Sequence, residues 1–405
     1  MFLTLDKFIL YGIIYKVKQM KKLLYFIPYA LFPTDSGGKK RIIQNLKILT
    51  GYFDVTVAGF CDSNRDLELL RNFTEKIFLV PFTKASNFEK LYLFMNKTPI
   101  TLADFYSQRL FETVKEILSE EKFDVIWINE IFMAQYLPDS FRGKKIFDRQ
   151  KSDSVYIEKI LKQLYPGYLQ RAVKQQDILN LKEYEKDVIK KFNIGFMPSE
   201  RDLNDLNNEE KEFYKILPNT ISLDEIEYTP FQKREKTNIL IFGNWEYAPN
   251  IDGLEWFINE IFQFVITQKN EIIFDVIGKG AEFLRLERNA NLRIFAYRSN
   301  LNNVLNYPGA MAVPLKIGGG TRYKILEGMA SGIPIISTEI GVEGLGLEEG
   351  KHYLGFSDKN EFYEKLKMLC SDPEKIKKII NYSRMFIEEN YSEENTIEII
   401  EDLIQ

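Results

Sequence analysis

The chain has 405 residues, of which 45% are hydrophobic and 28% charged, and its formal net charge is −4. This length favours two domains with ample core material, and the balanced charge disfavours DNA or RNA as a partner. Two isolated cysteines and a single histidine exclude a disulfide framework, a Cys/His zinc site and any mechanism that needs two histidines.

Residues 1–19 form an N-terminal extension rich in lysine and aromatic side chains. Its apolar run, residues 8–15, is too short to cross a bilayer, which takes about 20 residues. Two interpretations remain open: a basic segment that rests on a membrane surface, or an extension without a role. Because nothing points to disulfides, we expect a cytoplasmic protein, with peripheral contact at the inner face of the membrane as the further option.

From residue 22 onward, short apolar runs alternate with amphipathic stretches, which is typical of parallel strands joined by helices. In the first half the pattern predicts strands at 23–28, 54–60, 124–129, 145–148, 195–198 and 214–218, and helices ending near 50 and at 86–96, 103–120 and 151–192. Residues 226–237 lose this periodicity and are predicted to be a linker. The second half then predicts strands at 238–242, 272–277, 292–295, 310–313 and 333–337, and a helix at 251–267. The fold class is therefore α/β, with two doubly wound sheets.

The segment 314–338 carries the most chemical information. A strand ends near Pro314, three glycines follow at 318–320, and a helix is expected to begin near Thr321. Free N–H groups and the positive end of the helix dipole favour an anion there, and glycines let a ligand approach the backbone closely. Arg322 and Lys324 would oppose the dipole unless a diphosphate shares the site.

Glu327 lies six residues after Thr321, about 9 Å along the predicted helix. This spacing suits a ribose attached to the bound diphosphate, because a carboxylate accepts hydrogen bonds from both ribose hydroxyls. The alternative is a tight glycine turn followed by a solvated glutamate. Gly332 and Pro334 are expected to end the helix.

This stretch resembles family 4 glycosyltransferases, which carry the group-1 glycosyl transferase domain. Residues 242–257 and 276–280 are similar to the start of that family's donor domain, and Ser36-Gly37-Gly38 with Arg41 is similar to its acceptor-side loop. The resemblance covers most of residues 20–395. It implies the GT-B fold, two Rossmann-like doubly wound domains with a cleft between them.

The resemblance also implies a division of the chain and a reaction. Residues 1–19 are the extension, 20–225 the acceptor-side domain, 226–237 the linker, 238–373 the nucleotide-sugar donor domain, and 374–405 helices that pack back on the first domain. The implied activity is retaining transfer of a sugar (EC 2.4) from a nucleotide-diphosphate-sugar to an acceptor hydroxyl, without a metal or other cofactor. The expected acceptor is a saccharide or lipid-linked saccharide in bacterial surface polysaccharide or glycolipid synthesis.

The residues implied for donor binding are Gly243, Asn244, Lys279, Gly318, Gly319, Gly320, Thr321, Arg322 and Glu327, and those of the acceptor-side loop are Gly37, Gly38 and Arg41. Two departures from the family stand out. Gly319 replaces the first of two glutamates, and no Arg or Lys occurs between Lys236 and Lys269 to neutralise a diphosphate. We therefore assign that role to Arg322 and Lys324, with Lys279 and Lys316 in reserve.

Two acidic residues of the first half are further candidates. Glu130 and Asp148 follow apolar strands, at positions that face the ligand crevice in open α/β sheets. Each is a candidate acceptor contact or catalytic base, and capping of a strand end is the alternative. Two rival functions also remain: a catalytically silent GT-B protein that binds a nucleotide-sugar, and a nucleotide-sugar epimerase.

Overall fold

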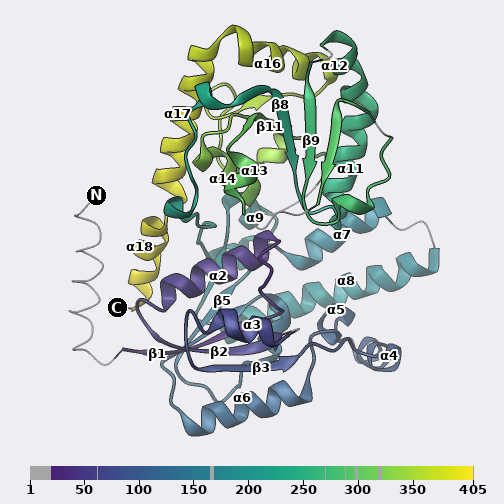
Figure 1. The fold of residues 1–405 in the computed structure, drawn as a ribbon. Helices are drawn as coiled ribbons and strands as arrows, with labels where there is room; N and C mark the ends of the chain where they lie inside the picture. The colour runs from purple at the N-terminus through teal and green to yellow at the C-terminus, as the bar shows by residue number, and fades with distance from the viewer. Residues whose placement is uncertain are drawn as a thin grey trace. The chain divides into compact units, whose positions relative to one another are not determined.

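The computed structural model describes residues 20–61, 63–164, 168–269, 271–287, 289–296, 300–317 and 322–404. Two compact units emerge, and each is built around one sheet (Figure 1). The N-terminal unit comprises the described residues up to Thr34 and Gly38–Leu217, and the C-terminal unit comprises Asp35–Gly37 and the residues from Pro218 onward. The division therefore falls at Leu217, whereas the sequence placed the end of the first domain at residue 225.

Within the described residues, the N-terminal unit holds a seven-stranded sheet in the order β3-β2-β1-β4-β5-β6-β7, with all neighbours parallel. Its strands are β1 (Lys22–Ile27), β2 (Asp54–Cys61), β3 (Ile77–Pro81), β4 (Val125–Asn129), β5 (Lys144–Asp148), β6 (Ile194–Met197) and β7 (Tyr214–Ile216). Its α-helices are α2 (Gly37–Leu49), α3 (Asn64–Leu70), α4 (Asn87–Met95), α5 (Ile100–Ala103), α6 (Gln108–Glu120), α7 (Asp153–Leu164), α8 (Tyr168–Val188), α9 (Glu200–Asn204) and α10 (Asn208–Phe213).

The described part of the C-terminal unit holds a six-stranded parallel sheet in the order β10-β9-β8-β11-β12-β13. Its strands are β8 (Glu235–Phe242), β9 (Ile273–Ile277), β10 (Leu292–Phe295), β11 (Pro308–Val313), β12 (Ile335–Ser337) and β13 (Leu354–Gly355). Its α-helices are α11 (Ala248–Phe257), α12 (Gln263–Gln268), α13 (Asn302–Leu305), α14 (Tyr323–Ser331), α15 (Glu339–Val342), α16 (Lys359–Ser371), α17 (Pro373–Asn390) and α18 (Glu393–Ile404). The last three residues of the predicted linker thus belong to β8.

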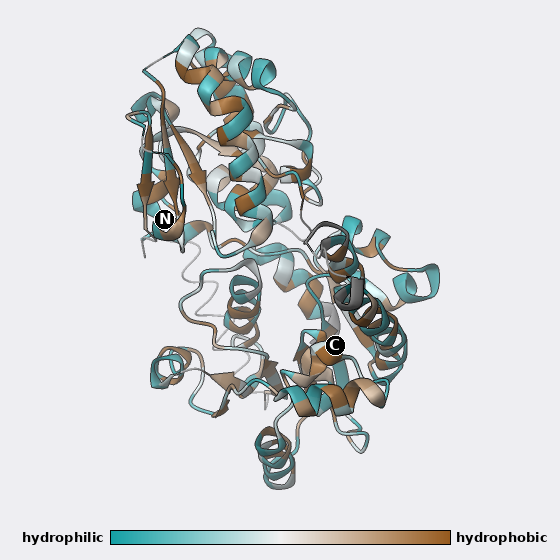
Figure 2. Cartoon of the chain, turned by 90° about the vertical axis from the view of Figure 1, so that its right-hand side faces the viewer, coloured by the Kyte–Doolittle hydropathy of each residue, from teal (hydrophilic) through white to brown (hydrophobic). Residues whose placement is uncertain are grey.

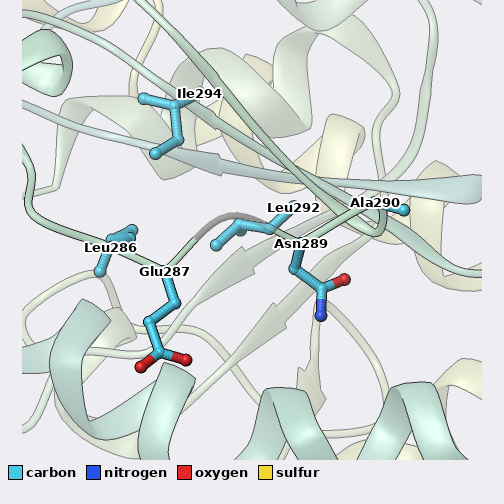
Figure 3. Close-up of a pocket in the computed structure, with 6 residues that line it drawn as sticks. All are labelled: Leu286, Glu287, Asn289, Ala290, Leu292 and Ile294. Atoms are coloured by element: carbon cyan, nitrogen blue, oxygen red, sulfur yellow. The ribbon is translucent and has the colours of Figure 1, made fainter.

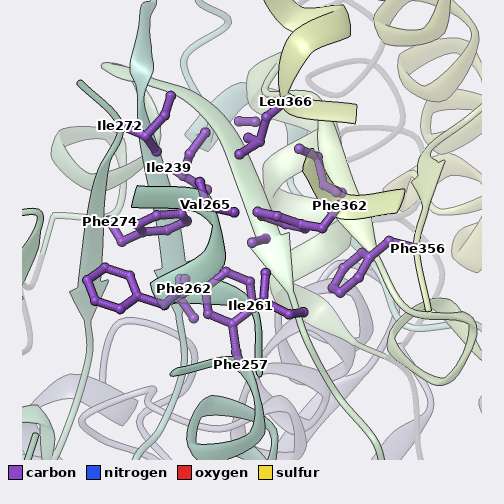
Figure 4. Close-up of a cluster of buried hydrophobic side chains, with 14 of the residues drawn as sticks. Ile239, Phe257, Ile261, Phe262, Val265, Ile272, Phe274, Phe356, Phe362 and Leu366 are labelled. Carbon is purple, nitrogen blue, oxygen red and sulfur yellow. The ribbon is translucent and has the colours of Figure 1, made fainter. Parts of the chain in front are cut away.

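The C-terminal sheet has a hydrophobic core on each face. Along β8, Ile239 and Ile241 enter one core cluster while Leu240 enters the other, because successive side chains of a strand point to opposite faces. The first cluster is rich in aromatic rings from α11, β9 and α16 (Figure 4). In Figure 2 the strands are coloured mainly as hydrophobic, whereas the helices carry both colours. Cores on both faces make this a doubly wound sheet, as predicted.

One predicted helix of the C-terminal unit is interrupted. Residues 251–267 were expected to be continuous, but a π-helical segment, Ile258–Phe262, separates α11 from α12. It inserts the buried Ile261 and Phe262 into the core cluster on that face. Such π segments are rare and occur mostly as single turns inside α-helices, so a pattern typical of an α-helix does not predict them.

The strand orders locate where a ligand should bind in each unit. In the N-terminal sheet the order reverses between β1 and β4, and in the C-terminal sheet between β8 and β11. Ligands of open α/β sheets bind outside the carboxyl ends of the strands at such a switch point. The loops that follow these four strands are therefore the places to look for a site.

Candidate functional site

The loop after β8 is held in place by backbone contacts with the neighbouring turn. The Gly243 N–H donates to the Ile277 carbonyl at 3.1 Å, and the Trp245 N–H donates to the Lys279 carbonyl at 2.8 Å. A Cβ atom on Gly278, whose φ is +143°, would lie 1.7 Å from the Gly243 oxygen. This close approach accounts for the glycine after β9 and leaves the loop little freedom.

Asn250 connects this loop to the helix that carries the predicted donor residues. Its side-chain amide donates to the Asn244 carbonyl at 2.8 Å, and its Oδ1 accepts from the Lys324 Nζ at 3.3 Å. Two predicted donor residues, Asn244 and Lys324, are thereby brought together at the β8/β11 switch point. Asn250 itself was not predicted as a site residue.

Helix α14 follows β11 and begins two residues later than predicted. Arg322 occupies its N-cap position, and Lys324 and Glu327 follow in the helix. Arg322 and Glu327 are both buried, with 9% and 5% of their surface exposed. The guanidinium of Arg322 and the carboxylate of Glu327 are thus buried within one and a half turns of the start of α14. The start of a helix favours binding of an anion.

Packing accounts for the close fit of α14 to the sheet. A Cβ atom on Gly328 would lie 2.5 Å from Met311 Cε of β11, so a larger residue would require neighbouring side chains to shift. The helix ends at Gly332, which adopts the left-handed conformation with φ 78°. The predicted C-cap is confirmed.

Four predicted donor residues, Gly318, Gly319, Gly320 and Thr321, lie outside the described residues. Their roles stay predictions. Lys279 is described, and it forms an ion pair with Glu246, the Nζ lying 2.8 Å from Oε2. Lys316 is exposed and lies over the ring of Trp256, with Nζ 5.7 Å from the centroid. Both reserve lysines are therefore engaged with residues of their own unit.

The surroundings of Lys324 strongly disfavour its charged form. Burial, followed by the nearby charge of Arg322, lowers the pKa of its ammonium to about 7. A second cation and a poorly hydrated environment both disfavour the charged form. An anion bound here would remove that penalty, so the arrangement favours a ligand that carries negative charge.

A pocket of about 430 Å³ lies elsewhere in the C-terminal unit, beside β10 (Figure 3). Its lining combines apolar side chains with Glu287 and Asn289. None of these residues belongs to the predicted donor set. The pocket is therefore not the candidate site.

In the N-terminal unit, Arg41 and Asp148 form a buried ion pair. Arg41 Nη2 lies 2.6 Å from Asp148 Oδ1, and Arg41 Nη1 donates to the Leu217 carbonyl at 2.8 Å. Asn45 donates to the second carboxylate oxygen of Asp148 at 2.9 Å. Arg41 and Asp148 expose only 1% and 2% of their surface. Both carboxylate oxygens are occupied, so this geometry supports the capping alternative for Asp148 and not a catalytic base.

Glu130 follows β4, and its carboxylate differs from that of Asp148 in its hydrogen bonding. It is 3% exposed, and its Oε2 has no hydrogen-bond partner among the described residues. Burial is the main cause that raises the pKa of this carboxyl to about 7. Its backbone has φ 65° and ψ 150°, a conformation that is rare for any residue except glycine. Strained backbone of this kind is often found at functional sites.

Two further polar side chains lie close to the start of α2. A Cβ atom on Gly38 would lie 2.7 Å from the Tyr29 hydroxyl and 2.6 Å from Gln150 Oε1. The Tyr29 hydroxyl is hydrogen-bonded to Gln150, and the charge of Glu130 contributes to raising the pKa of Tyr29, after burial as the main cause. Tyr29 and Glu130 follow β1 and β4, the two strands of the switch point. The sequence did not single out Tyr29 or Gln150.

His352 is structural. It is 4% exposed, its Nδ1 accepts from the Glu348 N–H at 3.0 Å, and its ring lies 4.7 Å from that of Phe386. Burial lowers the pKa of the imidazole, with Lys351 as a further cause.

Comparison with known proteins decides what kind of protein presents this geometry. Residues 236–372, which contain the β8/β11 site, match the family model described as "Glycosyl transferases group 1". The chain carries a group 1 glycosyl transferase domain. The glycosyltransferase is also similar to an uncharacterised 44.6 kDa protein in the cps region of Klebsiella pneumoniae. The two are 21% identical over 394 residues, which cover 92% of this chain and 97% of that protein.

Solved structures show the fold. HepE of Anabaena, in complex with UDP and glucose, has a TM-score of 0.64 at 12% identity, over 95% of this chain and 99% of that chain. TarM of S. aureus gives 0.63 at 13% identity, over 95% and 100%. WaaG, a glycosyltransferase involved in lipopolysaccharide biosynthesis, gives 0.61 at 13%, over 95% and 99%. The glycosyltransferase thus has the GT-B fold, as predicted.

Proposed function

We propose that this glycosyltransferase moves a sugar from a nucleotide-diphosphate-sugar to an acceptor hydroxyl, with retention of anomeric configuration and without a metal ion. The observation that carries the proposal is the cluster at the β8/β11 switch point, where Lys324 contacts Asn250 and Arg322 and Glu327 lie buried on the same helix. The structure of HepE with UDP and glucose supports a nucleotide-sugar as the donor.

Each group of the cluster has a part in donor binding. Arg322 and Lys324 neutralise the diphosphate, and the start of α14 adds its N–H groups and dipole. Glu327, farther along the helix, accepts hydrogen bonds from the ribose hydroxyls. The anomeric carbon forms a bond to the acceptor oxygen on the face from which the diphosphate departs, its bond to the diphosphate breaks, and the proton of the acceptor hydroxyl passes to the departing diphosphate. The same cations then stabilise the charge that develops on the leaving group.

Donor binding is expected to take up a proton at Lys324. The pKa of this ammonium is about 7 in the free protein, and a bound diphosphate raises it. Above about pH 7 the dissociation constant should therefore rise by up to about tenfold per pH unit. Calorimetry of nucleoside diphosphate binding in buffers of different ionisation enthalpy measures this uptake directly.

Lys324→Met should bind more weakly below about pH 7 and should lose the proton uptake. Lys367→Met, which removes an exposed lysine of α16, is the matched control and should behave as the wild type. Wild-type binding without proton uptake at alkaline pH would contradict the role of Lys324.

On the acceptor side, we assign Glu130, Tyr29 and Gln150 to binding of a sugar hydroxyl. A hydroxyl both donates and accepts, which matches a carboxylate beside a phenol and an amide. A side chain on Gly38 would displace the Tyr29 hydroxyl and the Gln150 amide, because its Cβ would lie 2.7 and 2.6 Å from them. Asp148 and Arg41 have a structural role in this region, since their charged groups form an ion pair with each other.

Glu130→Gln is expected to lower kcat/KM for the acceptor by about 10- to 100-fold, because a hydrogen bond to a charged group contributes about 1.5–3 kcal/mol. Since its pKa is about 7, the wild-type carboxylate forms as pH rises, and activity should rise with it. The variant should lose this acid limb of the pH profile, while donor binding stays unchanged. Asp139→Asn, at an exposed carboxylate of the same unit, is the control. An acid limb that persists in Glu130→Gln would refute the assignment.

The relatives support a product class. A similar protein is encoded in a cps region of Klebsiella pneumoniae, and WaaG takes part in lipopolysaccharide biosynthesis. These similarities support a saccharide or lipid-linked saccharide acceptor in bacterial surface polysaccharide or glycolipid synthesis.

The experiment that tests the proposed donor is a thermal-shift and calorimetric screen of UDP, GDP, ADP and their sugars. We expect one nucleoside diphosphate to stabilise the wild type, and to do so equally with and without EDTA. If none of them binds, the proposed donor class is wrong.

A further inference from the structure

Helix α4 presents its apolar side chains to solvent. It spans Asn87–Met95 and has no buried residue. Phe88, Leu91, Tyr92 and Met95 recur at the spacing of one helix face, and they are 78%, 56%, 63% and 75% exposed. We call these four residues the α4 stripe. In an ordinary surface helix such a face packs against the core, and here it faces outward.

The helix is held in this orientation by contacts on its other side. Lys90 forms an ion pair with Asp104 at 2.9 Å, and Leu93 and Phe94 are half-buried. Ser86 caps the first turn and accepts from the Glu89 N–H at 3.2 Å, while Glu89 bonds back to Ser86. A well-capped helix with a fixed inner face keeps the stripe outside.

The charges around the stripe are mainly positive. Lys84 and Lys97 lie just beyond its two ends, and both are exposed. Residues 84–97 hold one glutamate and three lysines, and of these lysines Lys90 is paired with Asp104, within a chain whose net charge is −4. A local basic excess on an acidic protein favours an anionic partner at this place.

We propose that the α4 stripe inserts into an anionic lipid surface, with Lys84 and Lys97 at the level of the headgroups. Helices that combine large apolar residues on one face with flanking lysines bind membranes in this way. A second copy of the chain fits less well. The stripe exposes on the order of 500 Å², whereas a stable interface takes about 800 Å² per partner.

The inference does not depend on the proposed reaction. No helix in the described part of the chain is long and apolar enough to cross a membrane, so a surface contact of this kind is a peripheral one. The α4 stripe is separate from residues 1–19. All variants below keep residues 1–19, so any membrane binding by that segment is the same in each of them.

The test is sedimentation of the full chain with phosphatidylcholine vesicles that contain or lack phosphatidylglycerol. The variant Phe88→Ser/Leu91→Ser/Met95→Ser replaces three of the four residues of the stripe and keeps Tyr92. The control Tyr382→Ser/Met385→Ser removes two apolar side chains of α17 that are 49% and 53% exposed. Thermal unfolding and light scattering on the same samples report folding and oligomeric state.

We expect the wild type to sediment with the anionic vesicles and much less with the neutral ones. The stripe variant should lose at least about tenfold in partition coefficient, and the control should keep its binding. Three results would overturn the proposal: no binding by the wild type, equal binding by the stripe variant, or a wild-type dimer that the stripe variant converts to a monomer. The last result would assign the stripe to a second copy.

Discussion

Replacing Glu327 by alanine is expected to weaken nucleoside diphosphate binding by about 10- to 100-fold, because a hydrogen bond to a charged group contributes about 1.5–3 kcal/mol. Glu327 is 5% exposed and lies on α14 after Arg322 and Lys324. If its carboxylate accepts the ribose hydroxyls, transfer of the sugar should fall by at least the same factor. Calorimetry with the diphosphate selected by the screen measures the loss.

A ligand that lacks both ribose hydroxyls makes this test specific. The wild type should bind the 2′,3′-dideoxy diphosphate more weakly than the parent, and Glu327→Ala should bind the two about equally. Glu339→Ala, at the start of α15 in the same unit, is the matched control. Discrimination that survives in Glu327→Ala would mean that another group binds the ribose.

Replacing Asp148 by alanine is expected to lower the free energy of unfolding by about 3–5 kcal/mol, because the buried Arg41 loses the partner of its charge. The guanidinium and carboxylate lie 2.6 Å apart with almost no exposure. Asn45 would also lose the acceptor of its amide. Urea unfolding of the purified variant measures the change.

The pair can also be replaced as a whole. Asp148→Leu combined with Arg41→Met removes both charges, and we expect it to recover most of the stability lost in Asp148→Ala. The result against this account is an Asp148→Ala protein that unfolds like the wild type and yet is inactive. That outcome would restore Asp148 as a candidate base.

The order of strands and helices could be predicted because buried parallel strands form continuous apolar runs. Two edge strands escaped prediction. β3 was missed although its five residues, Ile77–Pro81, are all apolar, and β13 has only two residues. The glycine that ends α14 could be predicted, since a left-handed C-cap strongly favours glycine.

The site could be predicted only where its residues are close in sequence. Arg322, Lys324 and Glu327 lie within two turns of one helix, so their spacing alone brings them together. Asn250 joins Lys324 across 74 residues, and Asp148 joins Arg41 across 107. Such pairs depend on how the strands are ordered in the sheet, which the hydrophobic pattern does not specify. Glu130 likewise follows β4 and contacts β5, where its N–H donates to the Asp148 carbonyl at 2.9 Å.

The most direct measurement of the central claim is release of nucleoside diphosphate from the selected nucleotide-sugar, followed together with glycosylated product by mass spectrometry and NMR, over a panel of bacterial saccharide and glycolipid acceptors in EDTA. We predict that diphosphate and product appear in equal amounts with the anomeric configuration of the donor, and that Glu327→Ala suppresses both. Tight donor binding with no release by any acceptor would contradict the account and favour a protein that binds nucleotide-sugars without transferring them.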